Sequence, residues 1–417
     1  MVSLFKPALF VIIKFILEVS LQQEEQFPNN NIKGCILPWN HIFGSITGKF
    51  HLCCHAEWET PPLVVGDSTQ SLSKIWNNEP LKKVRKQFLN DEVPLVCKNV
   101  CYDREALGVN SNRLSVNSRF KNQKFLQDNT LADGSLTTLP TYLDLRFGNL
   151  CNFKCRMCGP DASTSWYRDS NSSYSKTIDH YTNNDIIWED IPNIIPNLTD
   201  IYFAGGEPFI QDGHYKLLQL LIDSPYAKNI NLQYNSNLSY NKFKKFNLLE
   251  MWKNFKDVSI WPSIEGYKSH AEYSRKGLNW NTFENNVTHF RKHIKTFSSV
   301  INIFSISSMP ELILWFKKQR IDYYGTILMH PSYYSVTCLP KESKSFINNK
   351  YRRFLQKYRI FNKYDIKQIK DWLVFMNSRD DSHLLPEFKK EQIRLDLLRN
   401  ESFESTFPEY ESWYKNI

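Results

Sequence analysis

The sequence has 417 residues, of which 41% are hydrophobic, 14% aromatic and 23% charged. Its 28 Phe, 21 Tyr and 11 Trp exclude a chain that is disordered throughout, and 14 Gly with 19 Pro exclude a collagen-like composition. A mean hydropathy of −0.46 excludes a protein with many membrane spans. The net charge of +9 is local: residues 341–370 hold ten basic and two acidic residues, and ten minus two leaves +8.

The first residues contain an apolar segment, 8–17, which is interrupted by Lys14 and followed by Glu18. A membrane-spanning helix needs about 20 apolar residues, and no clear small-residue cleavage site of a signal peptide follows. We therefore expect no transmembrane segment. The pattern predicts an N-terminal extension over 1–30, either an amphipathic helix or an anchor on a membrane surface.

Three cysteines further along form a C-x3-C-x2-C motif at Cys151, Cys155 and Cys158. The motif follows residues 142–148, whose alternation and final Gly predict a strand. Thiolates are the soft ligands that iron–sulfur clusters need, and three of them leave one iron of a four-iron cluster without a protein ligand. The spacing favours such a cluster, and the alternative is a zinc site that takes a fourth ligand from elsewhere.

A second motif lies in residues 200–208, which read as a buried strand that ends in Gly205-Gly206-Glu207-Pro208. Two glycines allow the backbone to approach a ligand closely. Glu207 adds a carboxylate at the carboxyl end of the strand. Alone, this GGEP sequence could be an ordinary strand-to-helix turn, but after the cysteine motif it is a second sign of one site.

Together, the two motifs resemble the most diagnostic motifs of the radical S-adenosylmethionine (SAM) superfamily. The resemblance implies that Cys151, Cys155 and Cys158 are catalytic and hold a [4Fe-4S] cluster, with SAM at the open iron. It implies reductive cleavage of SAM to a 5'-deoxyadenosyl radical, which abstracts a hydrogen atom from a substrate.

The resemblance also implies SAM contacts beyond the cysteines. Glu207 would hold the amino group of SAM, Asn237 the ribose and Ser263 the methionine part. Arg275 stands where the superfamily often holds the SAM carboxylate, although this residue, Asn237 and Ser263 could also be ordinary loop or cap residues. Met157 replaces the usual aromatic residue beside adenine. The candidate cofactor-binding residues are Met157, Gly205, Gly206, Glu207, Asn237, Ser263 and Arg275.

Strand-like and helix-like segments alternate through the middle of the chain. The predicted strands are 142–148, 200–206, 229–236, 258–264, 299–307 and 323–330, and the predicted helices include 213–224, 280–293 and 310–319. This alternation predicts an α/β fold with a parallel sheet. Six units match the partial (β/α)6 barrel of the superfamily, with ligands at the carboxyl ends of the strands. We assign 138–335 to this barrel and 341–417 to a helical C-terminal cap.

A second group of cysteines lies in residues 31–118 and resembles a SPASM or twitch module, which implies an auxiliary iron–sulfur cluster. A structural zinc site is the alternative. Cys53 and Cys54 end a predicted hairpin, and because neighbours on a strand point in opposite directions, only one of them is expected to be a ligand. The module precedes the barrel here, whereas it usually follows it. The ligand set taken forward is Cys35, Cys54, Cys97 and Cys101, with Cys53 as the alternative to Cys54.

The basic segment 341–370 carries aromatic residues at spacings of 3, 4 and 3, which predict one face of a helix. The pattern favours an amphipathic helix with a core-facing aromatic stripe over an RNA-binding patch. The stripe consists of Tyr351, Phe354, Tyr358 and Phe361.

Three functions follow from these patterns: a radical SAM enzyme, a non-catalytic iron–sulfur or zinc protein that transfers electrons or binds a partner, and an RNA-modifying radical SAM enzyme. The GGEP sequence favours an enzyme, since an electron carrier has no use for it. The expected partners are SAM, a peptide or protein substrate, and a reductant such as flavodoxin or ferredoxin. Nine cysteines without a disulfide pattern, together with oxygen-sensitive clusters, indicate a cytoplasmic location.

Overall fold

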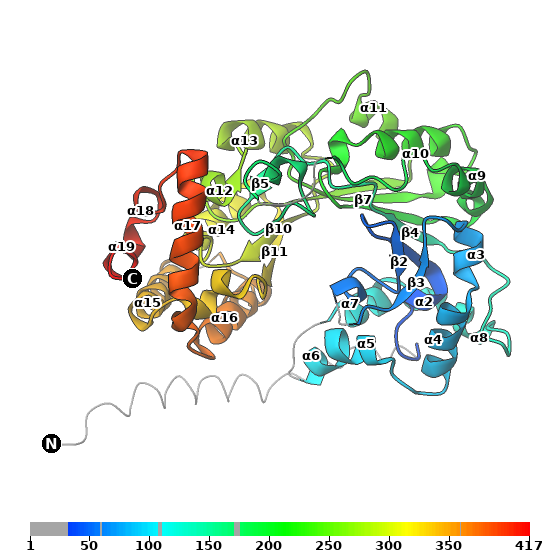
Figure 1. The fold of residues 1–417 in the computed structure, drawn as a ribbon, viewed down its shortest axis with the longest axis horizontal. Coiled ribbons are helices and arrows are strands. Elements are labelled where there is room, and N and C mark those ends of the chain that lie inside the picture. The colour runs from blue at the N-terminus through cyan, green and yellow to red at the C-terminus, as the bar shows by residue number, and fades with distance from the viewer. Residues whose placement is uncertain (1–31, 59–60, 107–110, 171–175, 359) are drawn as a thin grey trace.

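The computed structural model describes residues 32–58, 61–106, 111–170, 176–358 and 360–417 (Figure 1). The extension expected over 1–30 lies outside these residues. In the described part of the chain, no helix has both the length and the apolar character that crossing a membrane requires.

One mixed sheet of seven strands joins the N-terminal third of the chain to the middle. Its order is β3-β2-β1-β4-β6-β7-β8, and the pairs from β1 to β8 are parallel, whereas β1, β2 and β3 pair antiparallel. The strands are β1 (His41–Gly44), β2 (Lys49–His51), β3 (Val64–Asp67), β4 (Tyr142–Leu145), β6 (Asp200–Phe203), β7 (Asn231–Ser236) and β8 (Asp257–Pro262). The hairpin predicted before Cys53 is therefore present, and it extends the parallel sheet.

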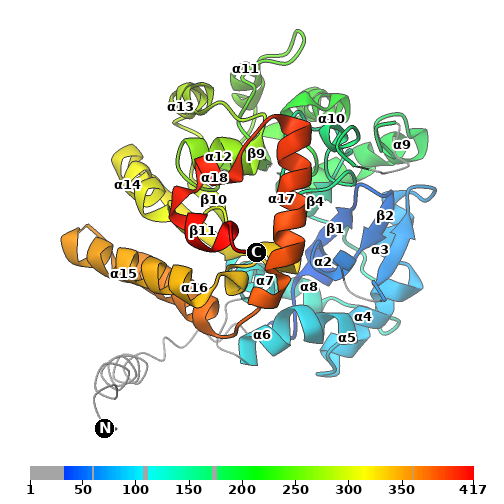
Figure 2. The same ribbon diagram turned by 60° about the vertical axis from the view of Figure 1, so that its left-hand side comes forward.

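Two more parallel strands, β10 (Thr296–Ile301) and β11 (Asp322–Ile327), continue this series. Two isolated parallel bridges connect β10 to β8. One joins Ile260 in β8 to Ile294, just before β10, and the other joins Ser263, just after β8, to Ser298 in β10. Helices follow the strands, and Figure 2 shows them around the outside. They are α9 (Asp185–Ile194), α10 (Asp212–Ile222), α11 (Leu248–Trp252), α12 (Ser269–Ser274), α13 (Trp280–His289) and α14 (Met309–Gln319). The predicted α/β fold with a mainly parallel sheet is confirmed.

The fifth predicted strand, 299–307, is displaced toward the N-terminus and ends at Ile301. Asn302 causes the difference, because its side-chain oxygen accepts hydrogen bonds from the backbone N–H groups of Phe304 and Ser305 at 2.9 and 3.0 Å. Such a local side-chain turn competes with the strand ladder. The apolar residues after Asn302 are buried in a turn rather than in the sheet.

The two faces of the sheet differ in polarity, as β7 shows. Leu232 and Tyr234 are buried, and the Tyr234 ring packs 5.4 Å from the ring of Trp252 in α11. The alternate residues Gln233 and Asn235 are half-buried on the opposite face. Helices therefore cover an apolar face, and polar side chains line the inner one.

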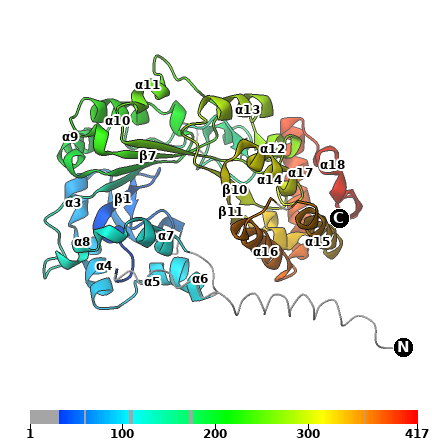
Figure 3. The ribbon, with the colours of Figure 1, turned by 180° about the vertical axis from the view of Figure 1, so that it is seen from behind.

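The N-terminal third adds short helices to its hairpin, below the sheet in Figure 1 and again in the view from behind (Figure 3). The helical stretch from Leu72 to Leu89 is interrupted at Asn77 and Asn78, because the Asn78 side chain caps a new helix by accepting from the N–H of Leu81. The helices are α2 (Leu37–Asn40), α3 (Leu72–Trp76), α4 (Glu79–Leu89), α5 (Leu95–Cys97), α6 (Asp103–Ala106), α7 (Asn112–Arg119) and α8 (Phe125–Asp128), with a π-helix at Lys98–Tyr102.

The C-terminal segment is helical, with its helices at the end of the molecule away from α3 and α4 (Figure 1). They are α15 (Lys341–Lys357), α16 (Lys363–Asn377), α17 (Leu385–Arg399), α18 (Phe403–Thr406) and α19 (Glu411–Tyr414). The aromatic stripe is split between α15 and the connection to α16, but it faces inward. Tyr351 and Phe354 are buried, and the rings of Tyr358 and Phe361 lie 5.6 and 4.8 Å from Phe354.

This burial predicts opposite effects for two neighbours on α15. Tyr351→Ala removes a fully buried ring, so we expect the free energy of unfolding to fall by about 3–5 kcal/mol, as for other buried aromatic residues. Arg352→Ala changes an exposed side chain, so the expected effect is within about 0.5 kcal/mol. Urea denaturation followed by circular dichroism compares the two variants. Equal stability losses would contradict the inward-facing stripe.

Candidate functional site

The loop that follows β4 carries the first three cysteines and is fixed from two sides. Cys155 lies in the short strand β5 (Lys154–Cys155), which pairs antiparallel with β9 (Arg275–Lys276). On the other side, the Trp166 indole N–H donates to the carbonyl of Cys155 at 2.9 Å, and the Ser165 hydroxyl donates to the carbonyl of Cys151 at 2.8 Å. The loop is thereby held in one conformation.

The three thiols of this loop act on one another electrostatically. A hydrogen bond between Cys155 and Cys158 lowers the pKa of the Cys155 thiol and raises that of Cys158. Burial raises the pKa of Cys151 to about 12, and the nearby charges of Cys155 and Glu207 add to this shift. The structure therefore brings together the three predicted ligands and the carboxylate of the GGEP turn.

The GGEP turn is bonded directly to the cysteine loop. The backbone N–H of Glu207 donates to the carbonyl of Leu150 at 2.8 Å. Gly206 has a φ of 45°, and a Cβ at this position would lie 2.4 Å from the Leu150 carbonyl oxygen and 2.9 Å from that of Gly148. Only glycine fits here, since a side chain would collide with backbone that cannot move away. The two sequence motifs thus form one packed unit.

Glu207 is almost completely buried, with 1% of its surface exposed. Its carboxylate accepts hydrogen bonds from the N–H of Phe209 at 3.1 Å, the hydroxyl of Ser236 at 2.7 Å and the N–H of Asn237 at 2.7 Å. Burial raises its pKa to about 7, against the lowering effect of these bonds. Glu207 therefore connects the GGEP turn to the end of β7, a role that the sequence did not indicate.

Two of the predicted SAM contacts lie against the thiols. The Asn237 side-chain nitrogen is 3.9 Å from the Cys151 sulfur and donates to the Asn152 side chain at 3.0 Å. Arg275 Nη1 is 3.8 Å from the Cys155 sulfur. Because the guanidinium is also paired with the buried Glu265, its charge is balanced inside the protein.

The other two lie at the edges of the same region. Ser263 follows β8, where its N–H donates to the carbonyl of Ser236 at 2.8 Å. Met157 is half-buried in the cysteine loop and packs against the core. The structure thus places Ser263 beside the strand that carries the Asn237 contact, and Met157 between two of the three cysteines.

Arg156 is a site residue that the sequence analysis missed, although its place inside the cysteine motif was a possible signal. Its guanidinium is buried and lies 3.6 Å from the centroid of the Tyr273 ring. Nη1 donates to the Gln392 side chain at 2.7 Å, and Nη2 is paired with Asp396 and Glu401 at 2.5 and 2.9 Å. Through these bonds the cysteine loop is attached to α17 and the residues that follow it.

The second group of cysteines is buried in the N-terminal third. The Cys53 thiol is under the electrostatic influence of its neighbour Cys54 and then of Cys35 and Cys97, and the Cys97 thiol is under that of Cys35 and Cys101. Burial is the largest cause that raises the pKa of each of these thiols, to about 12 for Cys35. Arg113 donates to the carbonyl of Gly34, the residue before Cys35, at 2.9 Å.

Cys54 has different neighbours, although it adjoins Cys53. Its thiol is hydrogen-bonded to Arg146 and is under the influence of Asp144 and Glu57. Asp144 lies in β4, so Cys54 faces the sheet, while Cys53 lies near Cys35 and Cys97. The structure therefore groups Cys53, rather than Cys54, with Cys35 and Cys97, which favours the alternative that the sequence analysis left open.

All nine cysteines are free thiols. Across the described residues, no three His, Cys, Asp or Glu side chains are grouped as ligands of one metal ion. A four-iron cluster binds each thiolate to a different iron, so its ligands stand further apart than those of a single ion. The chemistry of the two donor sets, three thiols in the loop and four in the N-terminal third, fits iron–sulfur clusters.

Comparisons with known proteins bear on the N-terminal third. Residues 35–102 match the family model of SPASM, an iron-sulfur cluster-binding domain. The match confirms the predicted likeness to this module. No curated protein matches the sequence.

Two crystal structures of SuiB from Streptococcus suis, one bound to the precursor peptide SuiA and one bound to S-adenosylmethionine, match at 13% identity and a TM-score of 0.35. The matches cover 63% and 66% of this chain. They cover 60% and 61% of SuiB, so the chain spans about three fifths of the structures that it matches.

The close approach at Gly206 predicts a strong effect of a single methyl group. Gly206→Ala should lower the free energy of unfolding by about 1–3 kcal/mol, because the new Cβ would meet the Leu150 oxygen in a strained conformation. The matched control is Gly159→Ala in the same loop, where the added Cβ meets only the end of the Asp161 side chain at 2.6 Å. Thermal unfolding compares the two, and similar melting temperatures would contradict the packing argument.

Proposed function

We propose that this protein is a radical SAM enzyme in which Cys151, Cys155 and Cys158 hold a [4Fe-4S] cluster that binds SAM. The observation that carries the proposal is the direct hydrogen bond between the GGEP turn and the cysteine loop. This bond places a glycine backbone beside three convergent thiols. Two donor side chains lie against these thiols, Asn237 at the sulfur of Cys151 and Arg275 at the sulfur of Cys155.

The arrangement of strands supports the proposal. We assign the six consecutive parallel strands, from β4 to β11 without the short β5 and β9, to a partial (β/α)6 barrel over 138–335, and the helices of 341–417 to its cap. The cysteine loop, the GGEP turn and Asn237 follow the carboxyl ends of β4, β6 and β7. In α/β barrels this end carries the active site.

When bound, a reduced cluster supplies one electron that cleaves SAM to methionine and a 5'-deoxyadenosyl radical, which takes a hydrogen atom from the substrate. The protein's own groups hold and orient the cofactors. Asn237 and Arg275 donate toward the thiolate sulfurs and so stabilise their negative charge. Burial raises the pKa of Glu207 to about 7. A positively charged amino group beside this carboxyl would lower the pKa and favour the ionised form.

The N-terminal third would hold an auxiliary cluster on Cys35, Cys53, Cys97 and Cys101. The match of residues 35–102 to an iron-sulfur cluster-binding domain supports this assignment. Enzymes that carry a module of this kind modify peptides and proteins, so we propose a peptide or protein substrate. Free thiols and reducible clusters suit a reducing compartment such as the cytoplasm, with a flavodoxin or ferredoxin as the electron donor.

RNA modification has less support. Tyr351 and Phe354 are buried, so they are not available to stack on bases. The basic face of α15 is then a solvated helix surface.

Reconstitution with iron and sulfide tests the main proposal. We expect about eight irons per chain, for two four-iron clusters, and 5'-deoxyadenosine on addition of dithionite and SAM. Cys155→Ala should keep about half of the iron and make no 5'-deoxyadenosine. The control is Cys338→Ala. This variant also removes a buried thiol, but Cys338 belongs to neither group of cysteines and donates to the carbonyl of Ser332. A fully loaded protein that never cleaves SAM would favour an electron carrier.

The different environments of Cys53 and Cys54 predict which one is a ligand. Cys53→Ala should lose about four of eight irons, because it removes a member of the four-thiol group. Cys54→Ala should retain all of them, since this thiol contacts Arg146 instead. Iron analysis after desalting measures both. Loss of iron from the Cys54 variant alone would restore the set with Cys54.

A further inference from the structure

The last residue of α17, Arg399, lies buried behind the cysteine loop with unused hydrogen-bond donors. Its side chain is fully buried, and Nε donates to the Asp169 carboxylate at 2.7 Å. The guanidinium stacks on Trp166, with Cζ 4.5 Å from the ring centroid. Within the described part of the chain, Nη1 and Nη2 have no hydrogen-bond partner. Buried donors without a partner are unusual, because their desolvation is not compensated.

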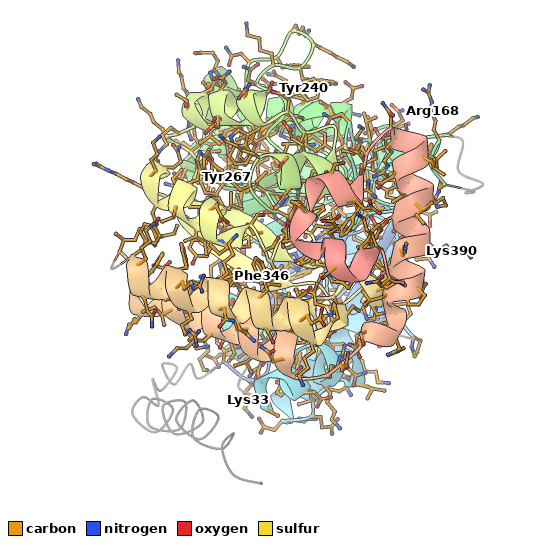
Figure 4. The ribbon with its side chains drawn as sticks, turned by 90° about the vertical axis from the view of Figure 1, so that its left-hand side faces the viewer. Lys33, Arg168, Tyr240, Tyr267, Phe346 and Lys390 are labelled. Atoms are coloured by element: carbon orange, nitrogen blue, oxygen red, sulfur yellow. The ribbon has the colours of Figure 1, made fainter. Side chains whose placement is uncertain are left out.

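The surroundings of Arg399 connect it to Cys155. Trp166, on which the guanidinium lies, donates from its ring N–H to the carbonyl of Cys155 at 2.9 Å. Lys154, the residue before Cys155, is paired with the same carboxylate of Asp169 that accepts a hydrogen bond from Arg399. Figure 4 shows Arg168, the neighbour of Asp169 in sequence, beside one end of α17. Helix α17 thus places the Arg399 guanidinium against Trp166, which is itself bonded to the cysteine loop.

The charge of Arg399 is only partly balanced. Asp169 is shared, because its second oxygen is paired with Lys154 at 2.8 Å while the first accepts from Arg399. Two positive charges therefore face one negative charge. Arg275 differs, since it is paired with its own carboxylate, Glu265. The excess positive charge and the two free donors suit an anionic group with several acceptor atoms, which thiolate-bound iron–sulfur clusters are.

We propose that Arg399 is a positioning residue that raises the reduction potential of the cluster on Cys151, Cys155 and Cys158. The inference rests on the proposed function. Reduction adds one electron to an already negative group, and a buried cation with free N–H donors stabilises the added charge. Because Arg399 belongs to α17, docking of this helix would make the cluster easier to reduce.

The test is a redox titration of the reconstituted full chain, followed by electron paramagnetic resonance. The signal to follow is the one that changes when SAM is added, since only a cluster with an open iron binds SAM. Arg399→Gln should lower the equilibrium constant for one-electron reduction at least tenfold, which is a shift of about 59 mV to lower potential. Arg399→Lys keeps the charge but loses the planar donors, so its reduction potential should lie between those of wild type and Arg399→Gln.

Asp169→Asn provides a second variant with the opposite sign. It keeps the size of the side chain and one acceptor oxygen but removes the negative charge shared by Lys154 and Arg399, so the potential should rise. The matched control is Arg394→Gln on the same helix. Arg394 contacts the backbone oxygen of Asp169 but is 42% exposed and paired with Glu391, so the potential should not change.

The outcomes separate the two proposals. A SAM-sensitive signal with the same potential in wild type, Arg399→Gln and Asp169→Asn overturns the role of Arg399 and leaves the proposed function intact. Shifts of opposite sign in the two variants support the role, and if Arg399→Gln does not fold, the rise in Asp169→Asn decides alone. Absence of any SAM-sensitive signal from iron-loaded wild type overturns the proposed function and this inference with it.

Discussion

The contact of Gly206 with the backbone oxygens of Gly148 and Leu150 determines how the candidate site is assembled. It allows the turn after β6 to lie directly on the loop after β4, with no side chain between them. Glu207 then accepts two hydrogen bonds at the end of β7, from Ser236 and Asn237, and a third from the N–H of Phe209 in its own turn. The ends of three neighbouring strands are thus fixed relative to one another by backbone packing and one buried carboxylate.

The order of modules along the chain does not decide how far apart they lie. The N-terminal module precedes the strands from β4 onward, yet its strand β1 pairs in parallel with β4, in a register that joins Phe43 to Asp144. Arg146 lies with its Cζ 4.8 Å from the centroid of the Phe43 ring and is hydrogen-bonded to the Cys54 thiol. A Cβ at Gly205 would also lie 3.0 Å from the Cβ of Arg146. The N-terminal module and the strands from β4 onward therefore share one continuous sheet.

The parts of this arrangement that could be predicted depend on residues close in sequence. Strand alternation located β4, β6, β7 and β8, and the spacing of three cysteines identified a loop in which the thiols meet. The turn at Asn302 was also local, but a polar side chain within an apolar run does not show whether it bonds its own backbone.

The parts that could not be predicted depend on pairs far apart in sequence. Which of Cys53 and Cys54 turns toward the other thiols depends on which face of the hairpin packs against β4, and nothing in the hairpin sequence gives this. Arg156 meets Asp396 and Glu401 only after α17 has docked. Periodicity describes the face of a helix, but it carries no information about the distant loop against which that face will pack.

The bonds between α17 and the cysteine loop imply that the two become ordered together. Arg156 is fully buried, and a buried arginine without its carboxylates would be strongly destabilising. Its partners lie on α17 and just beyond it, while Asp169 from the loop side receives Arg399 from the same helix. Neither element can bury its charged groups alone. A cysteine loop that is correctly formed therefore requires the C-terminal helix, which places the last part of the chain in the same cooperative unit as the site.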